Sequence, residues 1–315
     1  MLSRHEIIAL ALALVIGSVL SLRLGTFLTK PNLLNIARTF SWIAIAAFGE
    51  SIVIVTGGID MSVGAVMALA GLVSVMGMKA GLPVTAAIAA GLLVGVLVGW
   101  INGVVVGRVR LPPFIVTLGT MSIVRGIIFG LSGGWSFCVM PAGFRMLGQH
   151  TLSLGPLPLP LPVIIMLALA TLLHLFMRHT VLGNYIYTLG NSERALVSSG
   201  VNVAAIRVLV YILCGALAAT GGLLMTARLG VAAPTAATGY ELDIIAAAVI
   251  GGTSLLGGEG SIPGVLLGAA ILGILHNGLV LSGFSGYWGI AANGTMNLIF
   301  ILLDRWRRQR EDRGL

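Results

Sequence analysis

Residues 57–64 read Gly-Gly-Ile-Asp-Met-Ser-Val-Gly and interrupt an apolar run that extends from residue 41 to residue 78. The run is long enough to cross a bilayer, but the interruption sets the carboxylate of Asp60 among apolar neighbours. Residues 251–258 read Gly-Gly-Thr-Ser-Leu-Leu-Gly-Gly and break another apolar run late in the chain. Paired broken segments are where membrane transporters commonly place their pathway. The two breaks therefore indicate transport rather than simple anchoring.

The composition is that of an integral membrane protein. The chain has 315 residues, of which 57% are hydrophobic and only 9% are charged, so it has too little polar surface to cover a soluble globule. The net charge of +8 could suggest nucleic-acid binding. However, the basic residues lie between apolar runs and in the tail at residues 304–315, which membrane topology explains better. We expect membrane lipid and no nucleic acid among its partners.

Several kinds of chemistry have no sequence signal. The histidines and the two cysteines show no metal-ligand spacing, so we expect no metal site. Lys30 and Lys79 do not follow a glycine-rich phosphate loop, so we expect no nucleotide site. We therefore predict a transport subunit rather than an enzyme, with no cofactor on this chain. If ATP drives transport, ATP and Mg²⁺ must be bound by another chain.

Apolar runs predict an all-α, polytopic fold. A spanning helix needs about 20 apolar residues. Candidate spans are residues 6–24, 86–107, 114–131, 161–177, 206–227, 262–282 and 287–303. The pieces at 41–56, 65–78 and 242–256 flank the breaks and are shorter than a comfortable span. Together they give about ten membrane segments, some discontinuous, in a single transmembrane domain covering residues 1–315.

Arginines in short loops predict the orientation, because basic residues resist translocation. Placing Arg4, residues 108–110, the loop at about 178–207 and the tail on one side makes that side, with both termini, cytoplasmic. Arg23, Lys30 and Arg38 then fall outside, against the rule. The tail and the 178–207 loop carry more weight, because they are longer and richer in arginine.

Asp60 is the first candidate for a functional residue. A charge buried in hydrocarbon costs several kcal/mol unless its site is wet or paired, which favours a functional aqueous site. Alternatively, Asp60 is the N-cap of a helix that begins near Met61, and the two roles can coexist. Glu50 is either a pathway residue or an ion-pair partner for an arginine such as Arg125, and pairing is the favoured interpretation.

Other polar positions favour structural roles. Thr238 and Glu241 have the spacing of a capping box at a helix start. Arg125 is expected to be a structural ion pair or a snorkelling side chain. His276 beside Asn277 could face a pathway, but a hydrogen-bonded pair between helices is at least as well supported.

Residues 190–200 predict a short surface helix of about two turns. Asn191 or Ser192 is a suitable N-cap, Glu193 suits the positive helix end, and Gly200 can adopt the left-handed conformation that ends a helix. A helix this short is marginal alone, because nucleation is costly. It is therefore expected to pack against this chain's own helices or against a cytoplasmic partner.

Four segments together resemble the permease subunits of ribose-type carbohydrate ABC importers. The first is the Gly-Ile-Asp-Met-Ser-Val-Gly core of the first break. The others are Asn102-Gly103 followed by Pro-Pro-Phe-Ile-Val-Thr-Leu-Gly-Thr-Met at 112–121, the loop 183–201, and residues 234–261. Their order and spacing resemble the family from about residue 35 to residue 303. Such a set of motifs is specific for the family, though not for the cargo.

The resemblance implies a multi-pass permease of the bacterial cytoplasmic membrane. Its partners would be an identical or homologous second permease, two cytoplasmic ATPase subunits and an extracytoplasmic sugar-binding protein. Residues 190–200 would then be the coupling helix that rests in a groove of the ATPase. Arg194 replaces what is often a second acidic residue, Asn191 stands at a usual glycine, and His276 occupies a position often held by asparagine.

The sequence thus favours an alternating-access path for a small polyhydroxylated solute, driven by ATP on another chain. The predicted pathway or gate residues are Glu50, Gly57, Gly58, Asp60, Ser62, Asn102, Thr253, Ser254 and Asn277. The predicted ATPase-coupling residues are Gly190, Asn191, Ser192, Glu193, Arg194, Ala195 and Gly200. The alternatives are an ion-coupled secondary transporter that uses Asp60 and Glu50, and a membrane enzyme that uses Asp60 with His276, which lacks a nucleophile constellation.

Overall fold

The computed structural model describes residues 4–154, 157–283, 291, 294 and 295. These residues form twelve helices and one two-stranded hairpin. The elements are α1 (Arg4–Arg23), α2 (Lys30–Val55), α3 (Val63–Lys79), α4 (Val84–Gly107), α5 (Pro113–Ser132), α6 (Ala142–Gln149), β1 (Thr151–Leu154), β2 (Leu157–Pro160), α7 (Leu161–His179), α8 (Val181–Asn191), α9 (Glu193–Ser198), α10 (Val203–Leu229), α11 (Tyr240–Ile250) and α12 (Ile262–Leu281).

The predicted polytopic helical class is confirmed. Within the described residues, 7 helices are long and apolar enough to cross a membrane: α1, α2, α4, α5, α7, α10 and α12. Six of these fall on predicted spans with nearly the same bounds. The predicted span at 287–303 and the basic tail lie outside the described residues. The count of about ten segments therefore stays a prediction.

The first broken segment differs from its prediction. We expected a short piece at residues 41–56, whereas α2 has 26 residues and begins at Lys30. Hydropathy missed its first turns because Asn32 and Arg38 interrupt the apolar pattern. Both side chains have partners, since the amides of Asn32 and Asn277 bond each other at 2.9 and 2.8 Å, and Arg38 donates to Thr151 Oγ1 at 2.5 Å. By contrast, α11 is short as predicted, with 11 residues.

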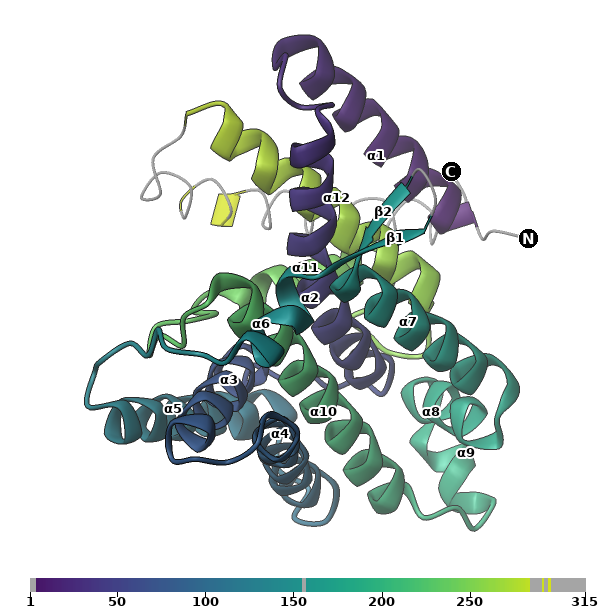
Figure 1. Ribbon diagram of the computed structural model, residues 1–315. Helices are drawn as coiled ribbons and strands as arrows, with labels where there is room; N and C mark the ends of the chain where they lie inside the picture. The colour runs from purple at the N-terminus through teal and green to yellow at the C-terminus, as the bar shows by residue number, and fades with distance from the viewer. Residues whose placement is uncertain (1–3, 155–156, 284–290, 292–293, 296–315) are drawn as a thin grey trace.

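Helices α2 and α10 form the centre of the molecule (Figure 1). α10 packs against α2, α3 and α4, while α12 packs against α2, α11 and α1. The contact between α4 and α10 is very close, because a Cβ added at Gly95 would overlap the backbone of Gly215. Small residues at such crossings let membrane helices pack through their backbones. By contrast, only 11% of the spanning window of α1, 17% of that of α5 and 28% of that of α4 is buried.

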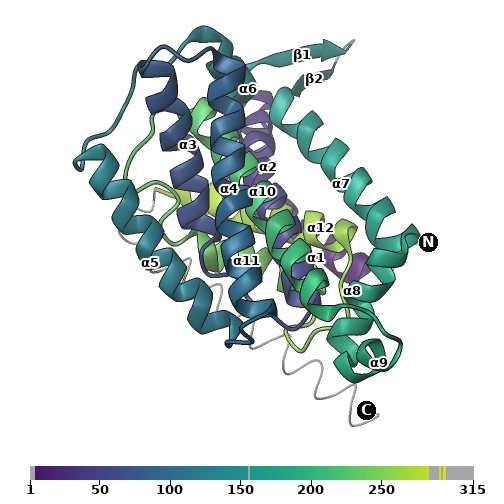
Figure 2. The same cartoon turned by 90° about the horizontal axis from the view of Figure 1, so that it is seen from below.

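The molecule has two distinct ends along its long axis (Figure 2). One end carries α6 and the β1–β2 hairpin, in which Thr151 pairs with Pro160 and Leu154 with Leu157. This hairpin is an exception that hydropathy did not predict, since its strands have only four residues each. The opposite end carries α9, and Arg110 lines the same hollow as α9. The arginines at 108–110 and the 178–207 loop thus share one end, as the basic-residue pattern predicts.

Candidate functional site: two broken segments joined to a surface helix

The first break is a short turn held by side-chain oxygens. α2 ends at Val55, and Gly57 follows with φ +81°, a conformation that favours glycine. Helix α3 begins at Val63 with Ser62 as its N-cap, so the prediction that Asp60 caps a helix starting near Met61 is wrong. Asp60 Oδ1 instead accepts hydrogen bonds from the backbone N–H of Ser62 at 2.8 Å and from its hydroxyl at 2.5 Å. An aspartate bonding the backbone two residues on stabilises a turn rather than a helix.

Helices α4 and α5 clamp this turn from the side. Asn102 of α4 donates to Ser62 Oγ at 3.0 Å and to Asp60 Oδ2 at 3.5 Å. Its carbonyl oxygen accepts from the hydroxyl of Thr120 at 2.7 Å. One helical turn earlier, Thr117 Oγ1 accepts from the backbone N–H of Met61 at 3.1 Å. The two threonines were not predicted, although hydroxyls three positions apart within the 112–121 motif share one helix face.

Glu50 completes the cluster from α2. Its Oε1 accepts from the backbone N–H of Asp60 at 3.0 Å, and its Oε2 lies 3.8 Å from the sulfur of Cys214. The favoured pairing of Glu50 with Arg125 is therefore wrong. Arg125 pairs instead with Glu241 at 3.3 Å and donates to the carbonyl of Ala236 at 2.7 Å.

The predicted capping box is also wrong. α11 has Gly239 as its N-cap, with φ +88° and no side-chain cap. The hydroxyl of Thr238 donates to the carbonyl of Thr235 at 2.8 Å. The Glu241 carboxylate has a cation available in Arg125, and a charge-assisted bond to Arg125 is stronger than a bond to a neutral backbone donor. The expected structural ion pair of Arg125 is confirmed, with a different carboxylate.

The cluster around Asp60 is closed. Glu50, Ser62 and Asn102 are 0% exposed, and Asp60 is 2% exposed. Each of these side chains has a hydrogen-bond partner within the cluster. In this conformation the cluster therefore fixes the shape of the break, because its polar atoms are occupied by one another.

The second break reaches the first through backbone contacts. α11 ends at Ile250, and Gly258 donates its backbone N–H to the carbonyl of Val55 at 2.8 Å. A Cβ added at Gly257 would lie 3.1 Å from the backbone nitrogen of Gly57. Of the predicted pathway residues here, Thr253 is 0% exposed and its hydroxyl has no hydrogen-bond partner within the described part of the chain. Ser254 is buried and shapes the loop by accepting from the N–H of Leu256 at 3.3 Å.

The end of α8 joins both breaks. A Cβ added at Gly190 would overlap the carbonyl oxygen of Val55 and the backbone nitrogen of Gly258. Asn191 donates to the carbonyl of Gly258 at 3.4 Å, and the Tyr187 hydroxyl donates to the carbonyl of Gly260 at 2.8 Å. Burial raises the pKa of Tyr187, so its hydroxyl keeps the proton that it donates. We call this three-way contact of 55–57, 190 and 257–258 the glycine joint.

The short helix predicted within residues 190–200 is confirmed as α9. Ser192 is its N-cap and accepts from the N–H of Ala195 at 3.3 Å. Gly200 follows with φ +76°, as expected of a helix stop. Leu196 is 3% exposed and anchors the helix, whereas the side chains of Glu193, Arg194 and Val197 lie on its exposed face. Leu196 is thus the one side chain of α9 that is buried against this chain, and the polar side chains of the helix lie on its exposed face.

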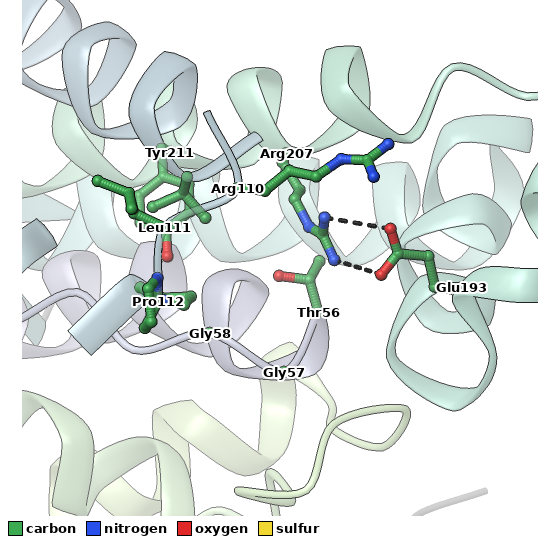
Figure 3. A pocket seen from close by; sticks show the side chains of 11 residues that line it. Thr56, Gly57, Gly58, Arg110, Leu111, Pro112, Glu193, Arg207 and Tyr211 are labelled. Atoms are coloured by element: carbon green, nitrogen blue, oxygen red, sulfur yellow. Dashed lines mark hydrogen bonds and ion pairs between the residues drawn. The ribbon is translucent and has the colours of Figure 1, made fainter. Parts of the chain in front are cut away.

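A cavity of about 410 Å³ separates α9 from the first break (Figure 3). It is lined by Thr56, Gly57, Gly58, Val106, Arg110, Leu111, Pro112, Pro113, Glu193, Arg207 and Tyr211. Glu193 and Arg207 form a two-pronged ion pair, with distances of 3.2 and 2.7 Å. Tyr211 is 1% exposed, and its hydroxyl has no partner among the described residues. The predicted residues Gly57 and Gly58 thus line a cavity, whereas Asn277 pairs with Asn32 away from it.

Metal binding has no support in the described part of the chain, where no group of three or more His, Cys, Asp or Glu side chains could hold an ion.

Comparison with known proteins places these features in a family. The model of the branched-chain amino acid transport system / permease component matches residues 32–303. The chain belongs to this permease family. It is 42% identical to the ribose import permease protein RbsC of Escherichia coli (strain K12) over 96% of this chain and 94% of that protein. It is 39% identical to the RbsC protein of Bacillus subtilis (strain 168) over 95% and 91% of the two chains.

A third relative carries a different name. The D-allose transport system permease protein AlsC of Escherichia coli (strain K12) is 37% identical over 93% of this chain and 89% of that protein. No solved structure matches the chain.

The chain is a multi-pass inner-membrane permease component of a sugar ABC importer, as the resemblance implied. As such a component it is not itself an enzyme and carries no cofactor of its own.

Proposed function

We propose that this permease moves a small, neutral, polyhydroxylated solute by alternating access, and that α9 couples the path to ATP hydrolysis on separate subunits. The glycine joint carries the proposal, because it connects the end of α8 directly to both breaks. The named cargoes of the relatives, ribose and D-allose, support a monosaccharide or a related polyol. The hydroxyl groups of Thr56 and Tyr211, which line the cavity beside the first break, can bond such a cargo.

The mechanism follows from the contacts on either side of the joint. An ATPase that moves α9 would displace α8, and the backbone contacts at Gly190 would carry that displacement to residues 55–57 and 257–258. The Glu193–Arg207 ion pair provides a second connection, from α9 to the central helix α10. Tyr211 lies one turn after Arg207 on α10 and faces the cavity. Both breaks would then change shape together, as one route to alternating access around a site between them.

The proposed partners occupy opposite ends of the permease. Two ATPase subunits would bind one α9 each across a pair of permease subunits, with a solute-binding protein at the end that carries α6 and the hairpin. We infer that the α9 end is cytoplasmic, because the basic loops gather there. Both termini are assigned to the same side. The exposed apolar faces of α1, α4 and α5 are suited to lipid or to the second permease.

The ion-coupled alternative assigns Asp60 and Glu50 as ligands of a proton or a sodium ion. The geometry favours a structural role, because both oxygens of Asp60 and one oxygen of Glu50 already accept hydrogen bonds. A cation would have to displace these donors. The two proposed functions also use different energy sources, namely ATP hydrolysis and an ion gradient. A reconstitution experiment can distinguish them.

We expect uptake of labelled D-ribose or D-allose into proteoliposomes to require the ATPase subunits, the binding protein and ATP on the side of the ATPases. A non-hydrolysable ATP analogue is the control and should give no uptake. Ionophores that collapse proton and sodium gradients should leave uptake unchanged. Uptake that persists without ATP but stops with the ionophores would establish the ion-coupled alternative instead.

A further inference from the structure

A second hollow of about 730 Å³ lies on the outer side of α9. It is lined by Arg110, Ser192, Glu193, Arg194, Val197 and Ser198. Arg110 does not belong to α9 but to the loop between α4 and α5. It lines both this hollow and the inner cavity, as does Glu193. The hollow therefore lies between two elements of the chain: the loop that carries Arg110 lines one side, and α9 lines the other.

The charges on this surface are unbalanced. The carboxylate of Glu193 is neutralised by its two-pronged pair with Arg207. Arg110 and Arg194 are exposed and form no ion pair within the described residues. The side chain of Val197 adds an exposed apolar patch beside them, with 59% of its surface open. The hollow therefore offers a partner two uncompensated guanidinium groups around an apolar centre.

The backbone at Arg110 is conformationally restricted. Its φ of +62° lies in the left-handed region, and the following residues Leu111, Pro112 and Pro113 lead directly into α5. The prolines restrict the backbone on the α5 side of the loop. Figure 3 shows the guanidinium of Arg110 extending above the Glu193–Arg207 pair and away from Arg207. Less conformational entropy is lost when a partner binds a side chain on a loop held in this way.

We propose that Arg110 is part of the ATPase docking surface and binds a carboxylate of the ATPase. This inference rests on the proposed function and extends the docking surface beyond α9. A stable interface buries at least about 1,000 Å², which six helical residues alone do not supply. A guanidinium–carboxylate pair beside the exposed Val197 also supplies orientation, because its geometry is directional. The α4–α5 loop thus senses the ATPase directly and adjoins the first break through Pro113, which lines the cavity with Gly58.

The test measures binding of the permease, in lipid nanodiscs, to the ATPase subunit that supports uptake in the reconstituted system. We expect Arg110→Gln to weaken binding about tenfold and to reduce its dependence on salt, as the loss of one charge-assisted bond requires. Arg110→Lys, which keeps the charge, should recover most of the affinity. Arg108→Gln is the matched control, because Arg108 is an exposed arginine of the same loop that lines neither hollow. It should change binding by less than about twofold.

The outcomes separate this inference from the proposed function. Wild-type affinity and salt dependence in Arg110→Gln would overturn the role of Arg110 while ATP-driven uptake still stood. Equal weakening by Arg108→Gln and Arg110→Gln would also overturn it, because the effect would then belong to the general charge of the loop. Arg110→Glu shows whether weaker binding results from the charge or from misfolding. If Arg110 binds a carboxylate, Arg110→Glu should bind the ATPase more weakly than Arg110→Gln does, while the thermal stability of the permease stays unchanged. Solute uptake that does not depend on the ATPase subunits would instead contradict the proposed function.

Discussion

Asp60→Ala is expected to abolish most ATP-driven uptake and to lower the thermal stability of the purified permease. The substitution removes the acceptor of the Ser62 backbone N–H, the Ser62 hydroxyl and the Asn102 amide. A buried polar group left without its partner costs about 1–3 kcal/mol. The turn between α2 and α3 would then lose its shape, and with it the contacts to Gly257 and Gly258. Uptake in proteoliposomes and thermal unfolding of the detergent-purified protein measure the two effects.

Asp60→Asn separates the hydrogen bonds from the charge. Asparagine keeps a carbonyl oxygen for Ser62. It loses the carboxylate charge and replaces the acceptor of the long 3.5 Å bond from Asn102 with an amide donor, so only that weak bond is lost with the charge. We therefore expect most of the wild-type uptake to remain. Ser74→Ala is a matched control, because Ser74 is also 0% exposed but donates to Ala87 away from the break. A variant Asp60→Asn as inactive as Asp60→Ala would show that the charge itself is required.

Several local features of this permease were predictable from its sequence, although the caps predicted at Asp60 and at Thr238–Glu241 were wrong. Most membrane spans follow from hydropathy alone. The N-cap of α9 was narrowed to Asn191 or Ser192 and its end was placed at Gly200, because capping depends on residues a few positions apart. The first break was recognised because a carboxylate in an apolar run is costly wherever the run lies. These predictions share one property, namely that the deciding interactions lie within one segment.

The pairing of distant side chains was not predictable in the same way. From the sequence, Glu50 was the favoured partner of Arg125. The observed pairing with Glu241 depends on how α5 is rotated and how it packs. Similarly, the hydrogen bonds between Asn32 and Asn277 could be recognised only once α2 and α12 were known to lie side by side. Each residue was conspicuous alone, but a single sequence contains no information on which two helices face each other.

The glycine joint was the least predictable feature. The sequence contains 44 glycines, so the composition does not distinguish Gly190 from glycines that merely permit helix packing. Its role depends on the backbones of three segments meeting at one place. Only the three-dimensional structure brings residues 55, 190 and 258 together.

Gly190→Ala is expected to uncouple transport from ATP hydrolysis. The new methyl group would overlap the carbonyl oxygen of Val55 and the backbone nitrogen of Gly258, neither of which can move away by changing a rotamer. Overpacking of this kind costs about 1–3 kcal/mol, which the structure can relieve by shifting the end of α8 away from the breaks. The exposed face of α9 would be unchanged, so ATPase binding should persist. Uptake should fall several-fold, and the solute-loaded binding protein should no longer stimulate ATP hydrolysis.

Gly17→Ala is the matched control for this substitution. Gly17 and Gly190 are both helical, so alanine brings each helix the same gain in intrinsic propensity of about 1 kcal/mol. They differ in their surroundings, because a Cβ at Gly17 would meet nothing within 4 Å. Wild-type uptake in both variants would contradict a transmitting role for the joint. Lost uptake together with lost ATPase binding would place the defect in docking instead, whereas retained binding with lost uptake is the result expected if the joint carries the motion of α9 to the two breaks.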